Sequence, residues 1–194
     1  MTPSPEHRPD WPLRTQRLVL RPWELGDLAA MYEIHRDPEV CRYLYEEPRT
    51  LDETRARLVH RMSMDALRRE GDWMGCAVTL AATGELVADL SLCWVSRLHR
   101  QGEIGFMVHP AHQGRGYATE MSVPLLDFGF REAGLHRIVG RLEARNIASA
   151  RVLAKLGMRR EAHLVENEWV KGEWQSEIVY AMLAAEWEHA ASRS

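Results

Sequence analysis

The sequence predicts an α/β fold of the α+β kind, in which a mixed, mostly antiparallel sheet of about six to seven strands carries helices on both faces. Three observations lead to this prediction. Strand patterns alternate with helix patterns in the middle of the chain, hairpin patterns lie toward both ends, and a glycine-rich turn joins one strand directly to a helix. Crossover helices join parallel strands and hairpins join antiparallel ones, so the sheet is mixed.

The elements follow from residue alternation, capping residues and turns. The predicted strands cover residues 18–22, 73–82, 85–94, 103–109, 137–143, 159–170 and 174–183. The predicted helices cover residues 27–36, 50–69, 118–134 and 146–157. Asp27, Thr50 and Asn146 are N-cap residues for three of these helices, and Gly157 ends the last one.

Length and composition indicate one folded domain. With 194 residues, 45% of them hydrophobic, the chain can bury one core without disulfides. A net charge of −3 gives no electrostatic reason to expect nucleic acid. Cys41, Cys76 and Cys93 form no Cys-x-x-Cys pair and are predicted to be buried free thiols. The absence of a long apolar run or signal region predicts a cytoplasmic protein without a membrane partner.

The stretch at residues 101–120 organises the rest of the chain. A mostly apolar strand at residues 103–109 is stopped by Pro110, and Gln113-Gly114-Arg115-Gly116-Tyr117-Ala118 forms a turn into a helix. Two glycines let the backbone approach a bulky group, and the first N–H groups of the helix point toward any anion placed there. Neither a Walker loop nor a dinucleotide fingerprint fits the spacing, and a plain tight turn is the alternative.

Two motifs in this order resemble those of the GNAT acetyltransferases. Gln113-x-x-Gly116-x-Ala118 resembles the acyl-CoA signature, and its continuation through Thr119-Glu120 resembles the RimJ/RimL branch. Asn146-x-x-Ser149, followed by Lys155-Leu156-Gly157-Met158, resembles the second signature of that branch, and Thr15-x-Arg17-Leu18-x-Leu20-Arg21 resembles its start. The resemblance implies one acetyltransferase domain at residues 15–187, between a flexible tail at residues 1–14 and a C-terminal tail at 188–194. Within the first tail, Trp11 could dock on the domain.

The resemblance also assigns the contacts with acetyl-CoA, which it implies as the cosubstrate. The pyrophosphate would bind at Gln113, Gly114, Arg115, Gly116, Tyr117 and Ala118, and the pantetheine arm would pair with Phe106, Met107 and Val108. A backbone N–H near Met107 or Val108 would polarise the thioester carbonyl. Asn146 either caps its helix or bonds the pantetheine arm.

Two residues carry the implied chemistry. Glu103 stands where several GNAT relatives have the base, and it needs a pKa raised by burial; alternatively it only pairs with an arginine on a neighbouring strand. Position 153 is leucine where many relatives have a tyrosine that protonates the leaving thiolate. The RimJ/RimL resemblance gives this role to Ser149, which would reach the sulfur of CoA and so is also implied as a cofactor contact. Ser149 could instead bond only to backbone.

The implied activity is acetyl transfer to a primary amine by direct attack in a ternary complex. The resemblance places a protein N-terminus first as the acceptor and a small amine second, near Tyr43, Tyr45, Glu46 and Glu47. Leu153 keeps open an alternative, a CoA-binding sensor or interaction module without efficient turnover. His109 and His112 lack a third ligand at a suitable spacing, so no metal is predicted, and a homodimer is left open.

Overall fold

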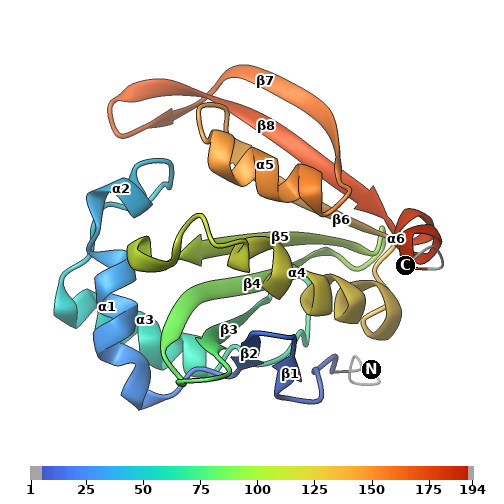
Figure 1. Ribbon diagram of the computed structural model, residues 1–194. Coiled ribbons are helices and arrows are strands. Elements are labelled where there is room, and N and C mark those ends of the chain that lie inside the picture. The colour runs from blue at the N-terminus through green and yellow to red at the C-terminus, as the bar shows by residue number, and fades with distance from the viewer. Residues whose placement is uncertain (1–5, 192–194) are drawn as a thin grey trace.

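The computed structural model describes residues 6–191, and within them eight strands form one sheet in the order β1-β2-β3-β4-β5-β6-β8-β7 (Figure 1). The strands are β1 (Leu13–Arg14), β2 (Leu18–Arg21), β3 (Trp73–Leu80), β4 (Leu86–Ser96), β5 (Gln101–Val108), β6 (Arg137–Glu143), β7 (Arg159–Val170) and β8 (Glu173–Leu183). All neighbouring strands are antiparallel except β5 and β6, which are parallel. The predicted mixed, mostly antiparallel sheet is confirmed.

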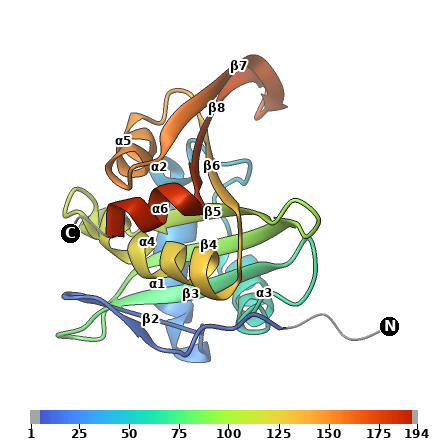
Figure 2. The same ribbon diagram turned by 90° about the vertical axis from the view of Figure 1, so that its right-hand side faces the viewer.

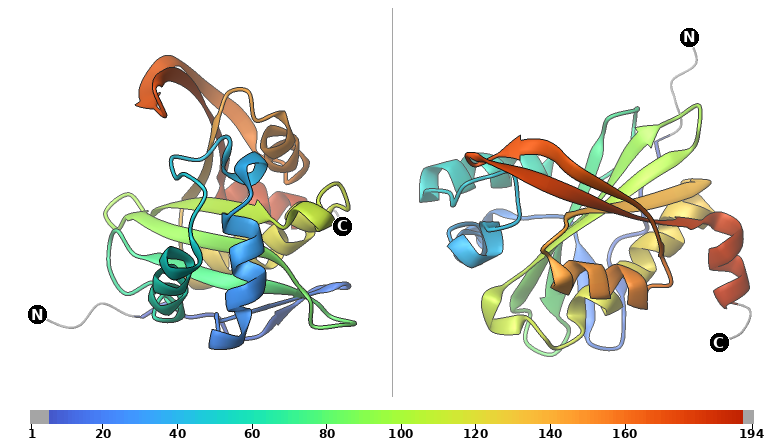
Figure 3. Two further views of the ribbon diagram at one scale, coloured as in Figure 1. Left: turned by 90° about the vertical axis from the view of Figure 1, so that its left-hand side faces the viewer. Right: turned by 90° about the horizontal axis from the view of Figure 1, so that it is seen from above.

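Helices cover both faces of this sheet, as predicted (Figures 2 and 3). The helices are α1 (Leu28–His35), α2 (Pro38–Cys41), α3 (Leu51–Met62), α4 (Tyr117–Asp127), α5 (Ile147–Lys155) and α6 (Ala184–Ala191), with short turns η1 (Leu25–Asp27), η2 (Pro110–His112) and η3 (Phe128–Glu132). α1 and α3 pack on one face through Met31 and Leu58, whereas α4 and α5 pack on the other through Met121 and Leu153. Among residues 6–191, no helix has the length and apolar character that a membrane crossing requires.

Strand alternation decides which residues of β5 point to which face. Ile104, Phe106 and Val108 belong to the core cluster under α4, whereas Met107 packs with the cluster under α1 and α3. Successive side chains of a strand point to opposite faces, so Glu103 lies on the same face as Met107. Side chains of β5 therefore reach both faces of the sheet.

The sheet has one strand more than the six to seven predicted, because β1 precedes the first predicted strand. Leu13 pairs with Leu20 and Arg14 pairs with Val19. A strand of two residues is too short to show an alternation pattern in the sequence. The end of the segment predicted as a flexible tail is thus part of the sheet, while residues 1–5 lie outside the described residues.

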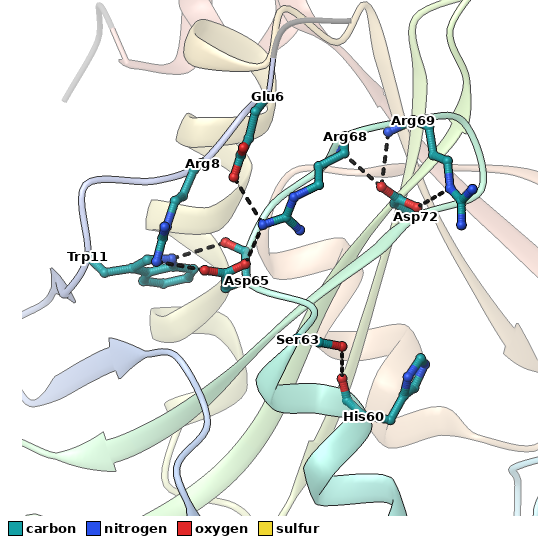
Figure 4. A network of polar contacts seen from close by, with 9 residues as sticks. All are labelled: Glu6, Arg8, Trp11, His60, Ser63, Asp65, Arg68, Arg69 and Asp72. Atoms are coloured by element: carbon teal, nitrogen blue, oxygen red, sulfur yellow. Dashed lines mark hydrogen bonds and ion pairs between the residues drawn. The ribbon is translucent and has the colours of Figure 1, made fainter. Parts of the chain in front are cut away.

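The segment before β1 is held by a polar network around Asp65 (Figure 4). The indole nitrogen of Trp11 donates to the Asp65 carbonyl at 3.2 Å, and Arg8 pairs with the Asp65 carboxylate at 2.6 Å. Arg68 contacts both Glu6, at 3.0 Å, and Asp65, at 2.8 Å. Residues 6–11 therefore lie against the chain that follows α3, and Trp11 is the docking residue that the sequence allowed.

One predicted helix end and one predicted domain end differ from the observed ones. The helix predicted for residues 50–69 ends at Met62, because the Ser63 hydroxyl bonds the His60 carbonyl at 2.7 Å and the chain then turns into a bridge between Leu67 and His7. The domain end predicted at residue 187 falls inside α6, where Glu188 pairs with Arg131 at 2.9 Å. Residues 192–194 of the predicted C-terminal tail lie outside the described residues.

All three cysteines are buried free thiols, as predicted. Burial raises the pKa of the Cys93 thiol to about 12, with Glu103 and Asp72 adding to the effect. Burial likewise raises the pKa of Cys41 and of Cys76. These thiols therefore remain protonated at neutral pH and behave as small apolar side chains.

Candidate active site

The site begins where β5 and β6 diverge. Their parallel pairing covers only residues 101–103 and 137–139. Beyond it, β6 continues paired with β8, and β5 continues to Val108 paired with β4. None of the described strands pairs with residues 104–108 on the side of β6, so a stretch of backbone edge inside the sheet has no strand partner.

A cavity of about 380 Å³ follows this divergence. The residues assigned to the cofactor that line it are Phe106, Met107, Val108, Gln113, Gly114, Ala118, Asn146 and Ser149. Arg115, Gly116 and Tyr117 are not among its lining residues. The opposite rim comes from α2 and the chain after it, through Val40 and Tyr43. Segments far apart in the sequence thus enclose the free edge of β5 (Figure 1).

One end of the cavity is the glycine turn at the start of α4. Gly114 has φ +75° and Gly116 has φ +82°, the left-handed region that side-chain-bearing residues rarely adopt. Gly116 is the N-cap of α4, and no side chain caps the first turn of the helix. A Cβ at Gly114 would meet nothing within 4 Å, so the backbone there is open. Uncapped N–H groups and the positive end of the helix dipole give this turn the chemistry that favours an anion.

Gln113 and Tyr117 hold the turn from either side. The Gln113 side-chain amide donates to the Val108 carbonyl at 3.2 Å, which ties the turn to the end of β5. The Tyr117 ring is buried in the core under α4. A contact from residue 117 to a ligand in the cavity would therefore come from its backbone, and the exposed Arg115 side chain lies away from the cavity lining.

Glu103 lies at the other end of the free edge, where both interpretations drawn from the sequence find support. Its carboxylate is 3.5 Å from Arg141 Nε on β6, while Arg141 makes its shorter contact, 2.7 Å, with Glu177. Burial raises the pKa of Glu103; the Arg141 charge opposes this shift and the Glu177 charge adds to it. An ion pair with a neighbouring strand is thus present, and burial still raises the pKa of the carboxyl, which is the direction that favours a base.

Asn146 and Ser149 lie beside the cavity at the start of α5. The Asn146 side chain accepts from the Ser149 backbone N–H at 3.0 Å, which is an N-cap contact. No residue within 6–191 bonds the Ser149 hydroxyl, so it is available to a ligand. Leu153 is buried, and a Cβ at Gly140 would lie 2.7 Å from its methyl carbons. Position 153 therefore seats α5 on β6 and supplies no proton.

The two histidines beside the turn have structural contacts. His112 is buried and its Nε2 lies 2.9 Å from the Glu85 carboxylate. His109 Nδ1 accepts from the Ala111 N–H at 3.2 Å. Among the described residues, no group of three or more His, Cys, Asp and Glu side chains is arranged to hold a metal ion.

A second cavity of about 140 Å³ adjoins the first and contains Glu103. Both cavities share Tyr43, Leu44, Arg141 and Leu142. The second is strongly acidic, because its charged lining residues are Glu103, Glu143, Glu168, Glu177 and Arg141. Of these, the sequence had pointed only to Glu103.

Two contacts connect α2 and the chain after it to the β7–β8 hairpin. The Tyr45 hydroxyl donates to the Glu168 carboxylate. Burial raises the pKa of Tyr45, and the bond to Glu168 adds to the effect. Lys171, at the hairpin tip, donates to the Cys41 carbonyl at 2.7 Å. Tyr43 and Tyr45, which the sequence placed near the acceptor, therefore line the second cavity.

The fold is shared with a solved acetyltransferase structure. The crystal structure of a GNAT-family acetyltransferase from Bacillus anthracis superposes with a TM-score of 0.82 at 30% identity, covering 90% of this chain and 99% of that one. The N-acetyltransferase YnaD of Bacillus subtilis (strain 168), described as uncharacterized, is 33% identical over 90% of this chain and 98% of its own length. A spermidine N(1)-acetyltransferase of Vibrio cholerae is 28% identical over 82% of this chain and 88% of its own length.

The family description "Acetyltransferase (GNAT) domain" matches residues 17–159. The chain belongs to this family and is an N-acetyltransferase of the GNAT type. The GNAT family predicted from the two sequence motifs is confirmed, and the RimJ/RimL branch within it stays a prediction.

Proposed function

We propose that this protein transfers an acetyl group from acetyl-CoA to a primary amine by direct attack in a ternary complex. The observation that carries the proposal is the divergence of β5 and β6 beside the uncapped start of α4. The free edge at residues 104–108 offers N–H and C=O groups to an extended arm, as to an added strand. The turn at Gly114 and Gly116 offers an anion site. A pantetheine arm that ends in a pyrophosphate would match both: the arm would pair with the free edge, and the pyrophosphate would bind at the turn.

In the proposed reaction, the amine nitrogen attacks the thioester carbonyl carbon, the carbon–sulfur bond breaks and the acetyl group stays on nitrogen. Glu103 takes the proton that the amine loses, through water, and its raised pKa supports this role. A backbone N–H near Met107 or Val108 stabilises the developing oxyanion. The Ser149 hydroxyl, which has no protein partner among residues 6–191, gives a proton to the departing sulfur and regains one from water, and Glu103 releases its proton to water.

For the acceptor we propose a small cationic amine first and a protein N-terminus second. Membership of the RimJ/RimL branch would favour the protein N-terminus. The second cavity, however, is lined by four glutamates against one arginine, which favours an acceptor with more than one positive charge. The similarity to a spermidine N(1)-acetyltransferase supports the same order.

The test measures thiol release from acetyl-CoA with polyamines, aminoglycosides and short peptides, checks product masses, and measures CoA binding by calorimetry. We expect turnover to be fastest with polyamines. Gly116→Val should weaken CoA binding, because valine is strained at φ +82°, whereas Gly26→Val, in open space, should not. Absence of CoA binding at millimolar concentration would refute the proposal. CoA binding without steady turnover on any amine would favour the non-catalytic module.

We also infer a cytoplasmic location, supported by the three buried free thiols. A disulfide in the natural protein, detected by mass spectrometry without reduction, would contradict this inference.

A further inference from the structure

Two segments of the sequence motifs have no role in the proposed chemistry. They lie in contact beside the glycine turn. Thr15 and Arg17 lie just before β2, and Glu120 lies in the first turn of α4. One Glu120 carboxylate oxygen accepts from the Thr15 hydroxyl at 2.6 Å and from the Arg17 backbone N–H at 2.9 Å. The other accepts from Arg17 Nε at 2.7 Å. The start of the domain is therefore bonded to the first turn of α4.

The same guanidinium also holds the turn itself. Arg17 Nη1 and Nη2 both donate to the Arg115 carbonyl at 3.3 Å, and Arg115 is the residue between the two left-handed glycines. The guanidinium lies 4.7 Å from the centre of the Tyr117 ring. The Arg17 carbonyl accepts from the Ala81 N–H at 2.9 Å, so the residue is fixed to the sheet. Arg17 thus joins the rigid sheet to the backbone of the turn.

The charge of Glu120 affects how well an anion can bind at the start of α4. A carboxylate in the first turn of a helix cancels part of the positive helix end and repels an anion that binds there. Burial would raise the pKa of Glu120, but the bonds from Thr15 and Arg17 outweigh burial and hold the pKa below its ordinary value. The group is therefore charged at neutral pH, and Arg17 Nη2, 2.6 Å from it, neutralises it.

We propose that Arg17 is a positioning residue for the anion site of α4: it holds the turn at Arg115 and neutralises Glu120, and so sets the affinity for the pyrophosphate of acetyl-CoA. The inference rests on the proposed function. It adds that a residue of the N-terminal segment, outside the cavity lining, controls cofactor affinity and not the chemical step.

The experiment measures the Kd of CoA and the KM and kcat of the full chain for Arg17→Gln, Glu120→Gln and the double variant. Arg17→Gln should weaken CoA binding about tenfold, since it exposes the anion site to an unpaired carboxylate and frees the turn. Its kcat at saturating acetyl-CoA should stay within about twofold. In the double variant, removal of the Glu120 charge should restore about threefold of the lost affinity.

A matched control is Arg36→Gln, at the C-cap of α1. Arg36 also pairs with a glutamate, Glu33, at 2.9 Å, and lies 5.5 Å from the Tyr32 ring centre, but it does not touch the turn. Its Kd for CoA should be that of the unchanged protein. Arg17→Lys keeps the charge but lacks the planar guanidinium with its several N–H donors, so its affinity for CoA should fall about threefold. This variant replaces Arg17→Gln should Arg17→Gln not fold.

The outcomes separate this inference from the proposed function. If the unchanged protein does not bind CoA, the proposed function fails. If the unchanged protein binds CoA and Arg17→Gln binds it equally well, only the proposed role of Arg17 is wrong. The same holds for Arg17→Lys where it replaces Arg17→Gln. An equal loss of affinity for Arg17→Gln with and without Glu120→Gln would show that the Glu120 charge plays no part in the affinity, and would overturn the proposal that Arg17 acts by neutralising it. A fall in kcat with unchanged Kd would do the same.

Discussion

Replacing Gly140 by alanine tests how α5 is seated beside the proposed active site. The added Cβ would lie 2.7 Å from both Leu153 methyl carbons and 3.3 Å from Leu153 Cγ. Carbon atoms in contact prefer about 3.5–4.0 Å, so the overlap is roughly 1 Å. Leu153 is buried, at 2% exposure, and cannot turn toward solvent. We expect the free energy of unfolding to fall by about 1–3 kcal/mol, the usual cost of overpacking a core.

A double-mutant cycle shows whether overlap with Leu153 causes the loss of stability in Gly140→Ala. Leu153→Ala alone should cost about 2–5 kcal/mol, because it removes a buried side chain. In that background the alanine at position 140 has room, so the change there should cost close to nothing. Urea unfolding followed by circular dichroism measures all four proteins, and an unchanged m-value shows that the native state stays compact. Gly26→Ala, in open space, is the matched control and should change stability by less than about 0.5 kcal/mol.

The same variant should impair activity, because α5 begins with the segment that carries Asn146 and Ser149 into the cavity. Lifting α5 from β6 should raise the KM for acetyl-CoA. Equal costs of the Gly140 change with and without Leu153→Ala would refute the reasoning, since the overlap would then not be the source of the instability.

Three further predictions concern the proposed chemistry. Glu103→Gln should lower kcat/KM about 10²–10⁴-fold. In the unchanged protein, activity should fall as decreasing pH protonates Glu103, at higher pH than for an ordinary carboxyl because burial raises its pKa; a flat profile there would exclude it as the base. Ser149→Ala should lower kcat about tenfold with unchanged CoA affinity, and undiminished turnover would remove its role. Tyr45→Phe should raise the acceptor KM about threefold while Tyr32→Phe does not, because Tyr45 bonds Glu168 beside the second cavity; an unchanged acceptor KM would place the acceptor elsewhere.

The first cavity was largely predictable because its signals are local. The strand, the left-handed glycines and the uncapped helix start follow one another within residues 101–120, so spacing alone brings them together. The N-cap contact of Asn146 is likewise local, over three residues. The packing of Leu153 against Gly140 could not be predicted in this way. It depends on how α5 crosses β6, which no local pattern encodes.

The second cavity could not be predicted for a related reason. Arg141 meets Glu177 because β8 lies between β6 and β7, an order that departs from the sequence order. Glu168 reaches the same place only after a register shift between Leu164 and Glu168, where Glu166 has φ +48°. Strand order and bulges are set by long-range packing, so the acidic character of this cavity appears only in the folded protein.

The position of the free β5 edge bears on aggregation. An unpaired strand edge normally invites another chain to add to the sheet. Here the unpaired residues 104–108 lie in the interior of the sheet, within a cavity walled by α2, α4 and α5. The outermost long strand, β7, starts with Arg159, Arg160 and Glu161 and is interrupted by its register shift. The protein therefore keeps its unpaired strand edge inside a cavity, while the charged residues and the irregular register of β7 protect the outer edge of the sheet from an added strand.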